Sequence, residues 1–168
     1  MNGYQRIKAV LSGEEPDTVP VMLHNFMMAA REAGMTMEQF RSDPREMARA
    51  FIESVERYEF DGVLIDVDTV TLAGAAGVPV NFPRDQAAQP AGARLHSIDE
   101  VLDLPPVDIR TYRPVQVWLE TASILVRHFD SNIFIRGNCD QSPFSLSSLI
   151  RGIEPWLMDI ADEDKHEL

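Results

Sequence analysis

The chain has 168 residues, 45% hydrophobic and 25% charged, a composition that is ordinary for a globular protein. Its formal net charge is -12, from 15 basic and 27 acidic residues, which argues against binding to nucleic acid or to anionic membranes. The single cysteine, Cys139, excludes an internal disulfide and a multi-cysteine zinc site within the chain. The sequence shows neither a signal-like apolar segment nor a membrane-length apolar run, so we expect a cytoplasmic protein.

The first part of the chain alternates between helical and extended patterns. Residues 4–11 predict an amphipathic helix, and residues 19–26 predict a strand. Asp43 and Pro44 are typical of an N-cap and a first helical residue, and the helix that they begin is predicted to end near residue 60. The nearly continuous apolar run over 62–68 then predicts a parallel strand covered on both faces.

The second part continues this alternation after an interruption. Residues 78–95 are rich in Pro, Gly and Ala and predict a hairpin-like excursion, and Ser97 has the chemistry of a cap for a short helix. The other predicted elements are helices over 69–76, 114–129, 143–151 and from 155, and a strand over 132–136. Strands that alternate with helices in this way indicate parallel βαβ units. We therefore predict an α/β fold with about three parallel units and an N-terminal helix.

Polar side chains follow each of the three predicted strands. The carboxyl ends of parallel strands lie at one edge of a sheet, where barrel enzymes hold their active sites. The residues at these ends are His24 and Asn25, then Asp66 and Asp68, then Asn138, Cys139 and Asp140. We predict that they converge in one site, with His24 and Asp68 as catalytic groups, the other five as substrate-binding groups, and no metal ligands.

Each candidate also has a structural interpretation. Asp66 and Asp68 lie two residues apart, so they share one face of a strand, and their repulsion suits a proton donor beside an ionised carboxylate. One of them could instead cap the following helix while the other faces water. His24 suits an acid, a base or a metal ligand, or a hydrogen-bonded structural residue. Cys139 suits a nucleophile or a buried inert thiol.

Methionines flank the end of the first predicted strand at Met22, Met27 and Met28. Methionine side chains line adaptable pockets and also fill irregular gaps in cores. Of these two interpretations, the sequence favours core filling. The run Ser142-Pro143 after the third predicted strand has the pattern of a helix N-cap followed by proline at the first helical position.

The run Gly-x-x-x-x-x-Pro-Phe-Ser-Leu over 137–146, together with the opening over 6–21, resembles the uroporphyrinogen decarboxylase superfamily. The resemblance implies a (β/α)8 TIM barrel. A complete barrel takes about 250 residues, so we expect residues 1–168 to be the N-terminal portion of one barrel domain, a partial barrel in a truncated chain. We expect this chain alone to be inactive and to self-associate through its exposed barrel edge.

The resemblance is closer to one branch of this superfamily than to the other. Its decarboxylases bind substrate carboxylates with two arginines after the first strand, and these positions fall on Asn25 and Ala29, with Arg31 at a different spacing. The decarboxylase tyrosine falls on Leu149, whereas Asp68 matches the aspartate that binds pyrrole nitrogens. The full-length protein is therefore expected to be a methyltransferase-like enzyme with a corrinoid or thiol methyl carrier. The alternative is uroporphyrinogen III decarboxylase, a lyase of tetrapyrrole, porphyrin and haem biosynthesis.

The cofactors and partners follow from the resemblance alone. Methyltransferases of the superfamily hold zinc with a His-x-Cys pair and a distant cysteine in their C-terminal half, so no cofactor is evident in this chain. The resemblance implies zinc and a corrinoid in the full-length protein, a small-molecule or tetrapyrrole-type substrate, and a corrinoid protein as partner. A further alternative is a non-catalytic binding module or an inactive fragment.

Overall fold

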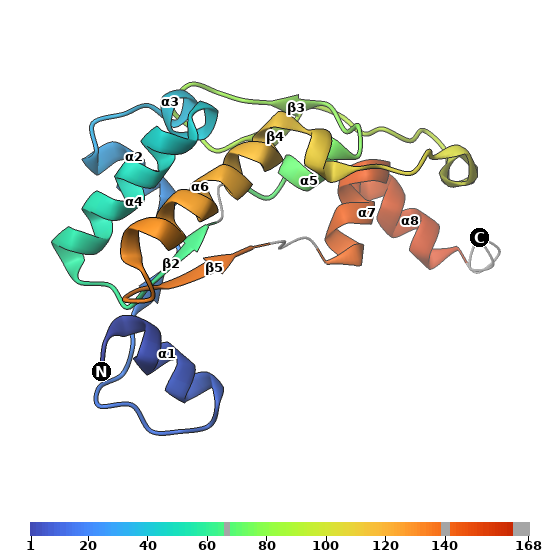
Figure 1. The fold of residues 1–168 in the computed structure, drawn as a ribbon. Helices are drawn as coiled ribbons and strands as arrows, with labels where there is room; N and C mark the ends of the chain where they lie inside the picture. Colours follow the sequence, from blue (N-terminus) through green and yellow to red (C-terminus); the bar gives the residue numbers. More distant parts are fainter. Residues whose placement is uncertain (66–67, 139–141, 163–168) are drawn as a thin grey trace. The chain divides into compact units, whose positions relative to one another are not determined.

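The computed structural model describes residues 1–65, 68–138 and 142–162, and the chain forms two compact units (Figure 1). The first unit contains residues 1–67, 84–87 and 116–138. The second contains residues 68–83, 88–115 and 139–168. No helix in the described ranges has both the length and the apolar character needed to cross a bilayer.

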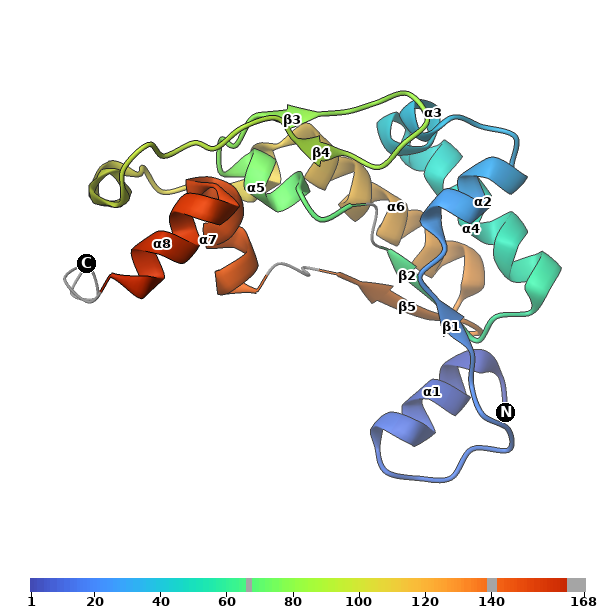
Figure 2. The ribbon, with the colours of Figure 1, turned by 180° about the vertical axis from the view of Figure 1, so that it is seen from behind.

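A three-stranded parallel sheet lies at the centre of the first unit (Figure 2). Its order is β1 (Met22–Leu23), β2 (Gly62–Ile65) and β5 (Phe134–Gly137), with Gly62 of β2 opposite both Met22 and Phe134. The central strand carries the apolar run that predicted a strand covered on both faces, and its Val63 and Ile65 are buried. The sequence-based prediction of a partial barrel with three parallel strands is therefore confirmed.

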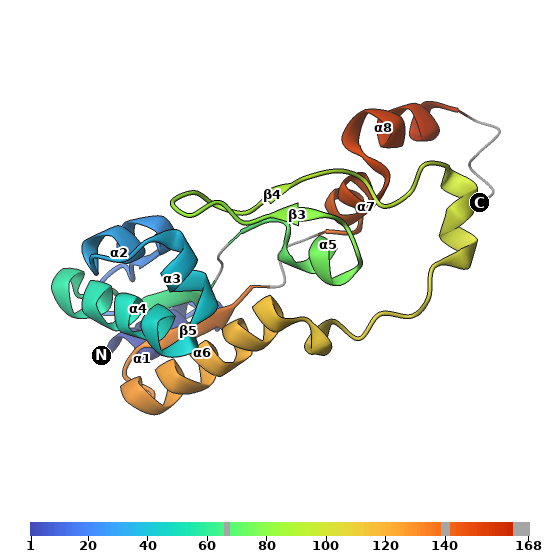
Figure 3. The same ribbon diagram turned by 90° about the horizontal axis from the view of Figure 1, so that it is seen from above.

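Four helices share a hydrophobic core with this sheet: α2 (Phe26–Glu32), α3 (Met37–Ser42), α4 (Pro44–Tyr58) and α6 (Arg113–Phe129). Figure 3 shows α4 and α6 running alongside β5. Phe40, Phe51 and Leu125 come from three different helices and are completely buried in one core with β2. The alternating pattern thus folds because the helices and the central strand bury their apolar faces in one shared core.

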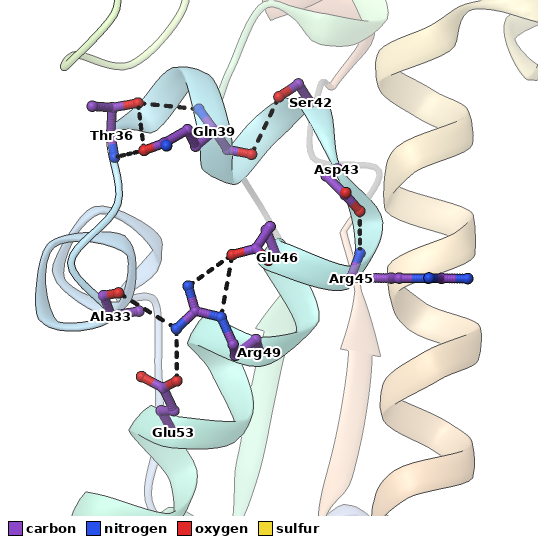
Figure 4. Close-up of polar contacts among 9 residues, drawn as sticks. All are labelled: Ala33, Thr36, Gln39, Ser42, Asp43, Arg45, Glu46, Arg49 and Glu53. Atoms are coloured by element: carbon purple, nitrogen blue, oxygen red, sulfur yellow. Dashed lines mark hydrogen bonds and ion pairs between the residues drawn. The ribbon is translucent and has the colours of Figure 1, made fainter.

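The starts of α3 and α4 are capped by side chains (Figure 4). The Thr36 hydroxyl accepts a hydrogen bond from the Gln39 backbone N–H at 3.2 Å, and the Gln39 side chain accepts from the Thr36 N–H at 2.9 Å. This is a complete capping box. Asp43 accepts from the Arg45 N–H at 2.8 Å, and Pro44 is the first residue of α4, as the sequence predicted.

Arg49 joins α4 to the end of α2 (Figure 4). Its guanidinium donates to Glu46 at 2.7 Å, to Glu53 at 2.8 Å and to the carbonyl of Ala33 at 3.4 Å. These two carboxylates raise the pKa of Arg49. Both ion pairs are exposed and lie within α4, so they add little to stability, and only the hydrogen bond to Ala33 links α4 to the end of α2.

Helix α1 (Gly3–Leu11) lies where the strands begin, at the opposite end from their carboxyl termini (Figures 1 and 2). Arg6 donates to Asp61 at 2.9 Å and to Asp17 at 2.7 Å. Asp61 accepts from the Val21 N–H at 2.8 Å, which fixes the start of β1 beside β2. A Cβ atom on Gly3 would lie 2.6 Å from the Asp61 backbone, so this close approach requires glycine. The network therefore stabilises the amino-terminal end of the sheet.

The second unit contains the predicted hairpin and a pair of helices. Strands β3 (Val80–Asn81) and β4 (Gln89–Pro90) are antiparallel, as expected for the excursion over 78–95. In Figure 3, α7 (Pro143–Arg151) and α8 (Ile153–Ala161) follow one another as a pair, and Arg151 donates to the buried Asp159 at 2.7 Å. The remaining elements of this unit are α5 (Thr71–Ala75), η1 (Ile98–Asp103) and η2 (Ile109–Thr111).

The predicted strand over 19–26 is too long at both ends. β1 contains only Met22 and Leu23, and Phe26 is already the first residue of α2. Two physical reasons account for the difference. Ala, Met, Arg and Glu dominate α2 and are strong helix formers, and Gly34 follows its end with a φ of 71°.

Candidate functional site

The carboxyl end of β1 carries two of the predicted site residues, and their side chains have different surroundings. Asn25 donates through its Nδ2 to the Oγ of Ser54 at 2.8 Å, and Ser54 is a buried residue of α4. The Asn25 side chain makes no capping bond to α2. It therefore ties the strand end to α4. His24 is exposed, and its ring lies 5.1 Å from the ring of Phe26.

A pocket of about 390 Å³ opens at this end of the strand. Six consecutive residues line it: Leu23, His24, Asn25, Phe26, Met27 and Met28. Four of these side chains are apolar, and the two polar ones are both predicted site residues. This lining suits a ligand with an apolar group, and the imidazole of His24 and the amide of Asn25 are the two polar groups in the pocket wall.

A second pocket, of about 530 Å³, shares two of these methionines. We call it the methionine pocket, and it is lined by Met27, Met28, Ala30, Arg31, Met35, Met37 and Asp85. Met27 and Met28 are 44% and 38% exposed, so the interpretation of these two side chains as core filling is wrong. The sequence does not indicate this pocket, because Asp85 reaches it from the hairpin, far away along the chain.

Asp68 is buried in the second unit, and both of its carboxylate oxygens are engaged. Oδ1 accepts from the Val70 and Thr71 N–H groups at 2.8 and 2.7 Å, and Oδ2 accepts from the Thr71 hydroxyl at 2.8 Å. These contacts agree with the structural interpretation of Asp68, in which one of the two aspartates caps the helix that follows. Burial, with a smaller contribution from the negative charge of Asp68, raises the pKa of Tyr112, a residue that the sequence analysis did not single out.

Asn138 follows the carboxyl end of β5, and His24 follows the carboxyl end of β1, so both lie at the same edge of the sheet. Its N–H donates to the Ile65 carbonyl at 3.2 Å, which extends the pairing of β2 and β5 by one residue. The first unit therefore brings His24, Asn25 and Asn138 to the carboxyl edge of one sheet. A joint site with Asp68 stays a prediction.

The other predicted binding residues, Asp66, Cys139 and Asp140, lie outside the described residues. Within the described ranges, no three His, Cys, Asp or Glu side chains come together as a metal site would require. The described side chains therefore do not fit the zinc ion that the resemblance implies for the full-length protein.

Comparisons with known proteins agree with this fold. Among solved structures, a methyltransferase from Methanosarcina mazei superposes with a TM-score of 0.84 at 20% sequence identity. The match covers 98% of this chain and 50% of that methyltransferase, so this chain spans about half the length of the solved protein. The curated proteins contain no significant match. The sequence profile of the family described as uroporphyrinogen decarboxylase (URO-D) matches residues 2–166. Because the profile covers almost the whole chain, including all three strands of the parallel sheet, the chain belongs to the uroporphyrinogen decarboxylase (URO-D) family.

Proposed function

We propose that this chain forms the first part of the active site of a methyltransferase-like enzyme, which moves a methyl group to or from a corrinoid or thiol carrier. The observation that carries the proposal is the lining of the pocket at the end of β1. The two positions at which the decarboxylases of the superfamily hold arginines are occupied by Asn25, bound to Ser54, and by Ala29, which is buried. Neither can hold a substrate carboxylate as a guanidinium does.

The charge of the chain supports the same choice. A polycarboxylate ligand would approach a chain of net charge -12 and meet a pocket that lacks the paired cations. A methyl group and its carrier need an apolar, polarisable wall, which Met27, Met28 and Phe26 supply. The solved methyltransferase with the same fold is consistent with this choice, although its 20% identity concerns the fold alone.

In this proposal, the chain's own polar groups handle protons and position the reactants. Transfer of a methyl group to a thiol releases the thiol proton, and the exposed imidazole of His24 is the proposed general base that accepts it. Asp68 is the second proposed catalytic residue. The proposed substrate-binding residues are Asn25, Asp66, Asn138, Cys139 and Asp140.

Binding measurements with two tetrapyrrole-type probes test the proposal. The chain is titrated with cobalamin, a corrinoid, and separately with uroporphyrin, a porphyrin polycarboxylate, and its tryptophan fluorescence is followed. We expect cobalamin to bind more tightly than uroporphyrin. Met28→Glu places a charge in the apolar wall and should weaken cobalamin binding, whereas Leu119→Glu, at an exposed position of α6, should not. Tighter binding of uroporphyrin, with no effect of Met28→Glu, would instead favour the decarboxylase.

A further inference from the structure

The methionine pocket contains two side chains of opposite charge that are not used by the proposed methyl transfer. Arg31 is exposed on α2, and it forms no ion pair with any residue in the described ranges. Asp85 is also exposed, and its Oδ2 is 3.9 Å from the Nε of Arg84, a loose and exposed contact. Both charges are therefore available to a ligand. Because they have opposite signs, the pocket favours a ligand that carries both a negative and a positive group.

Asp85 is held at the pocket by the backbone around it. The hairpin tip, residues 84–87, is part of the first unit and is anchored on α3. The Glu38 N–H donates to the Arg84 carbonyl at 2.9 Å, and the Arg41 guanidinium donates to the Gln86 carbonyl at 3.1 Å. Asp85 lies between these two hydrogen-bonded residues, so the backbone that carries its carboxylate is held in place beside the pocket.

The rest of the lining is apolar and adaptable. Met35 and Met37 are buried and form the inner wall, while Met27 and Met28 are partly exposed. Thioether side chains are flexible and polarisable, so they adjust to apolar groups of different shape. A volume of about 530 Å³ lies in the range of small-molecule sites, and two polar groups in an otherwise apolar lining are typical of such sites.

We propose that the methionine pocket binds a small zwitterion with an apolar side chain, that is, a neutral α-amino acid. Arg31 receives the carboxylate, Asp85 receives the ammonium group, and the methionines enclose the side chain. A guanidinium can bind a carboxylate through two parallel hydrogen bonds, and an ammonium group can donate to both carboxylate oxygens of an aspartate. The proposal does not depend on methyl transfer, because amino-acid binding is measured without a methyl donor or a corrinoid.

The test compares L-leucine with two analogues that each lack one charge. Isothermal titration calorimetry is carried out on the 168-residue chain with L-leucine, with 4-methylpentanoate, which has no amine, and with 3-methylbutylamine, which has no carboxylate. We expect L-leucine to bind, and each analogue to bind about tenfold or more weakly, since each loses one charge-assisted contact. Absence of leucine binding at millimolar concentration, or equal binding of the three compounds, would overturn the proposal.

Two substitutions test whether Arg31 binds the carboxylate and Asp85 the ammonium group of the ligand. Arg31→Gln should weaken binding of L-leucine and 4-methylpentanoate about tenfold and leave 3-methylbutylamine unchanged. Asp85→Asn should weaken L-leucine and 3-methylbutylamine and leave 4-methylpentanoate unchanged. Arg45→Gln and Asp103→Asn change exposed side chains of the same types outside the pocket and serve as controls. All four positions are exposed, so the variants are expected to fold, which circular dichroism checks. If both pocket variants bind L-leucine as the controls do, the pocket is not an amino-acid site.

Discussion

The hydrogen bond between Asn25 and Ser54 is the contact that joins the proposed site to the core, and its removal is a direct test of the site's construction. The two side chains meet at 2.8 Å, and Ser54 is only 3% exposed. A neutral hydrogen bond contributes about 1 kcal/mol net, and leaving its buried partner unsatisfied costs about 1–3 kcal/mol. We therefore expect Asn25→Ala and Ser54→Ala each to lower the free energy of unfolding by about 1–2 kcal/mol.

A double-mutant cycle isolates this contact. Urea unfolding is followed by circular dichroism for both single variants and for the double variant, with Ser123→Ala, an exposed serine of α6, as the control. Because the two side chains share one hydrogen bond, the double variant should lose about 1 kcal/mol less than the sum of the single losses. If the two single losses add within about 0.5 kcal/mol, the contact does not contribute as the structure indicates.

The same variants show how Asn25 acts on the site. Since its amide is already bound to Ser54, we expect Asn25→Ala and Ser54→Ala to weaken cobalamin binding by similar factors, through the position of the strand end. A much larger effect of Asn25→Ala would assign the amide a direct contact with the ligand. Ser123→Ala should leave cobalamin binding unchanged.

Two further predictions concern the amino-terminal end of the sheet and its unpaired edges. The carboxylate of Asp17 accepts hydrogen bonds from Arg6 and from the N-terminal ammonium, and these bonds lower its pKa. The stabilisation that Asp17 contributes is therefore complete above the ordinary aspartate pKa near 4, and it is lost as the pH falls toward the lowered pKa. Urea unfolding between pH 5 and 2 should therefore show a weaker acid destabilisation for Asp17→Asn, and equal acid slopes would contradict this assignment. We also propose that the chain self-associates through the exposed edges of the sheet, because within the described ranges β1 and β5 each pair only with β2, and Leu23 on β1 is exposed. Light scattering should show association that rises with concentration. The association should decrease in Leu23→Lys but not in the α6 control Leu119→Lys. A monomer at all concentrations would refute the proposed self-association.

Local signals in the amino-acid sequence were enough to predict several elements. Asp43-Pro44 marks the start of α4, Ser142-Pro143 marks the start of α7, and the predicted helix over 143–151 has the bounds that the structure shows. The apolar run from Gly62 predicted the central parallel strand. These features depend on caps, proline geometry and hydrophobic periodicity, which act within a few residues of the chain. The order of the three strands then followed from the alternation of strands and helices.

The contacts of the side chains at the site could not be predicted from local signals. The two-residue strand β1 ends where Asn25 reaches Ser54 on α4, and no local signal marks that partner. The methionine pocket likewise joins α2 to Asp85, which is carried by a hairpin tip anchored on α3. Such contacts depend on how elements distant in the chain pack around one core. Periodicity predicts which face of each element is apolar, but the positions of polar groups on neighbouring elements arise only when those faces meet.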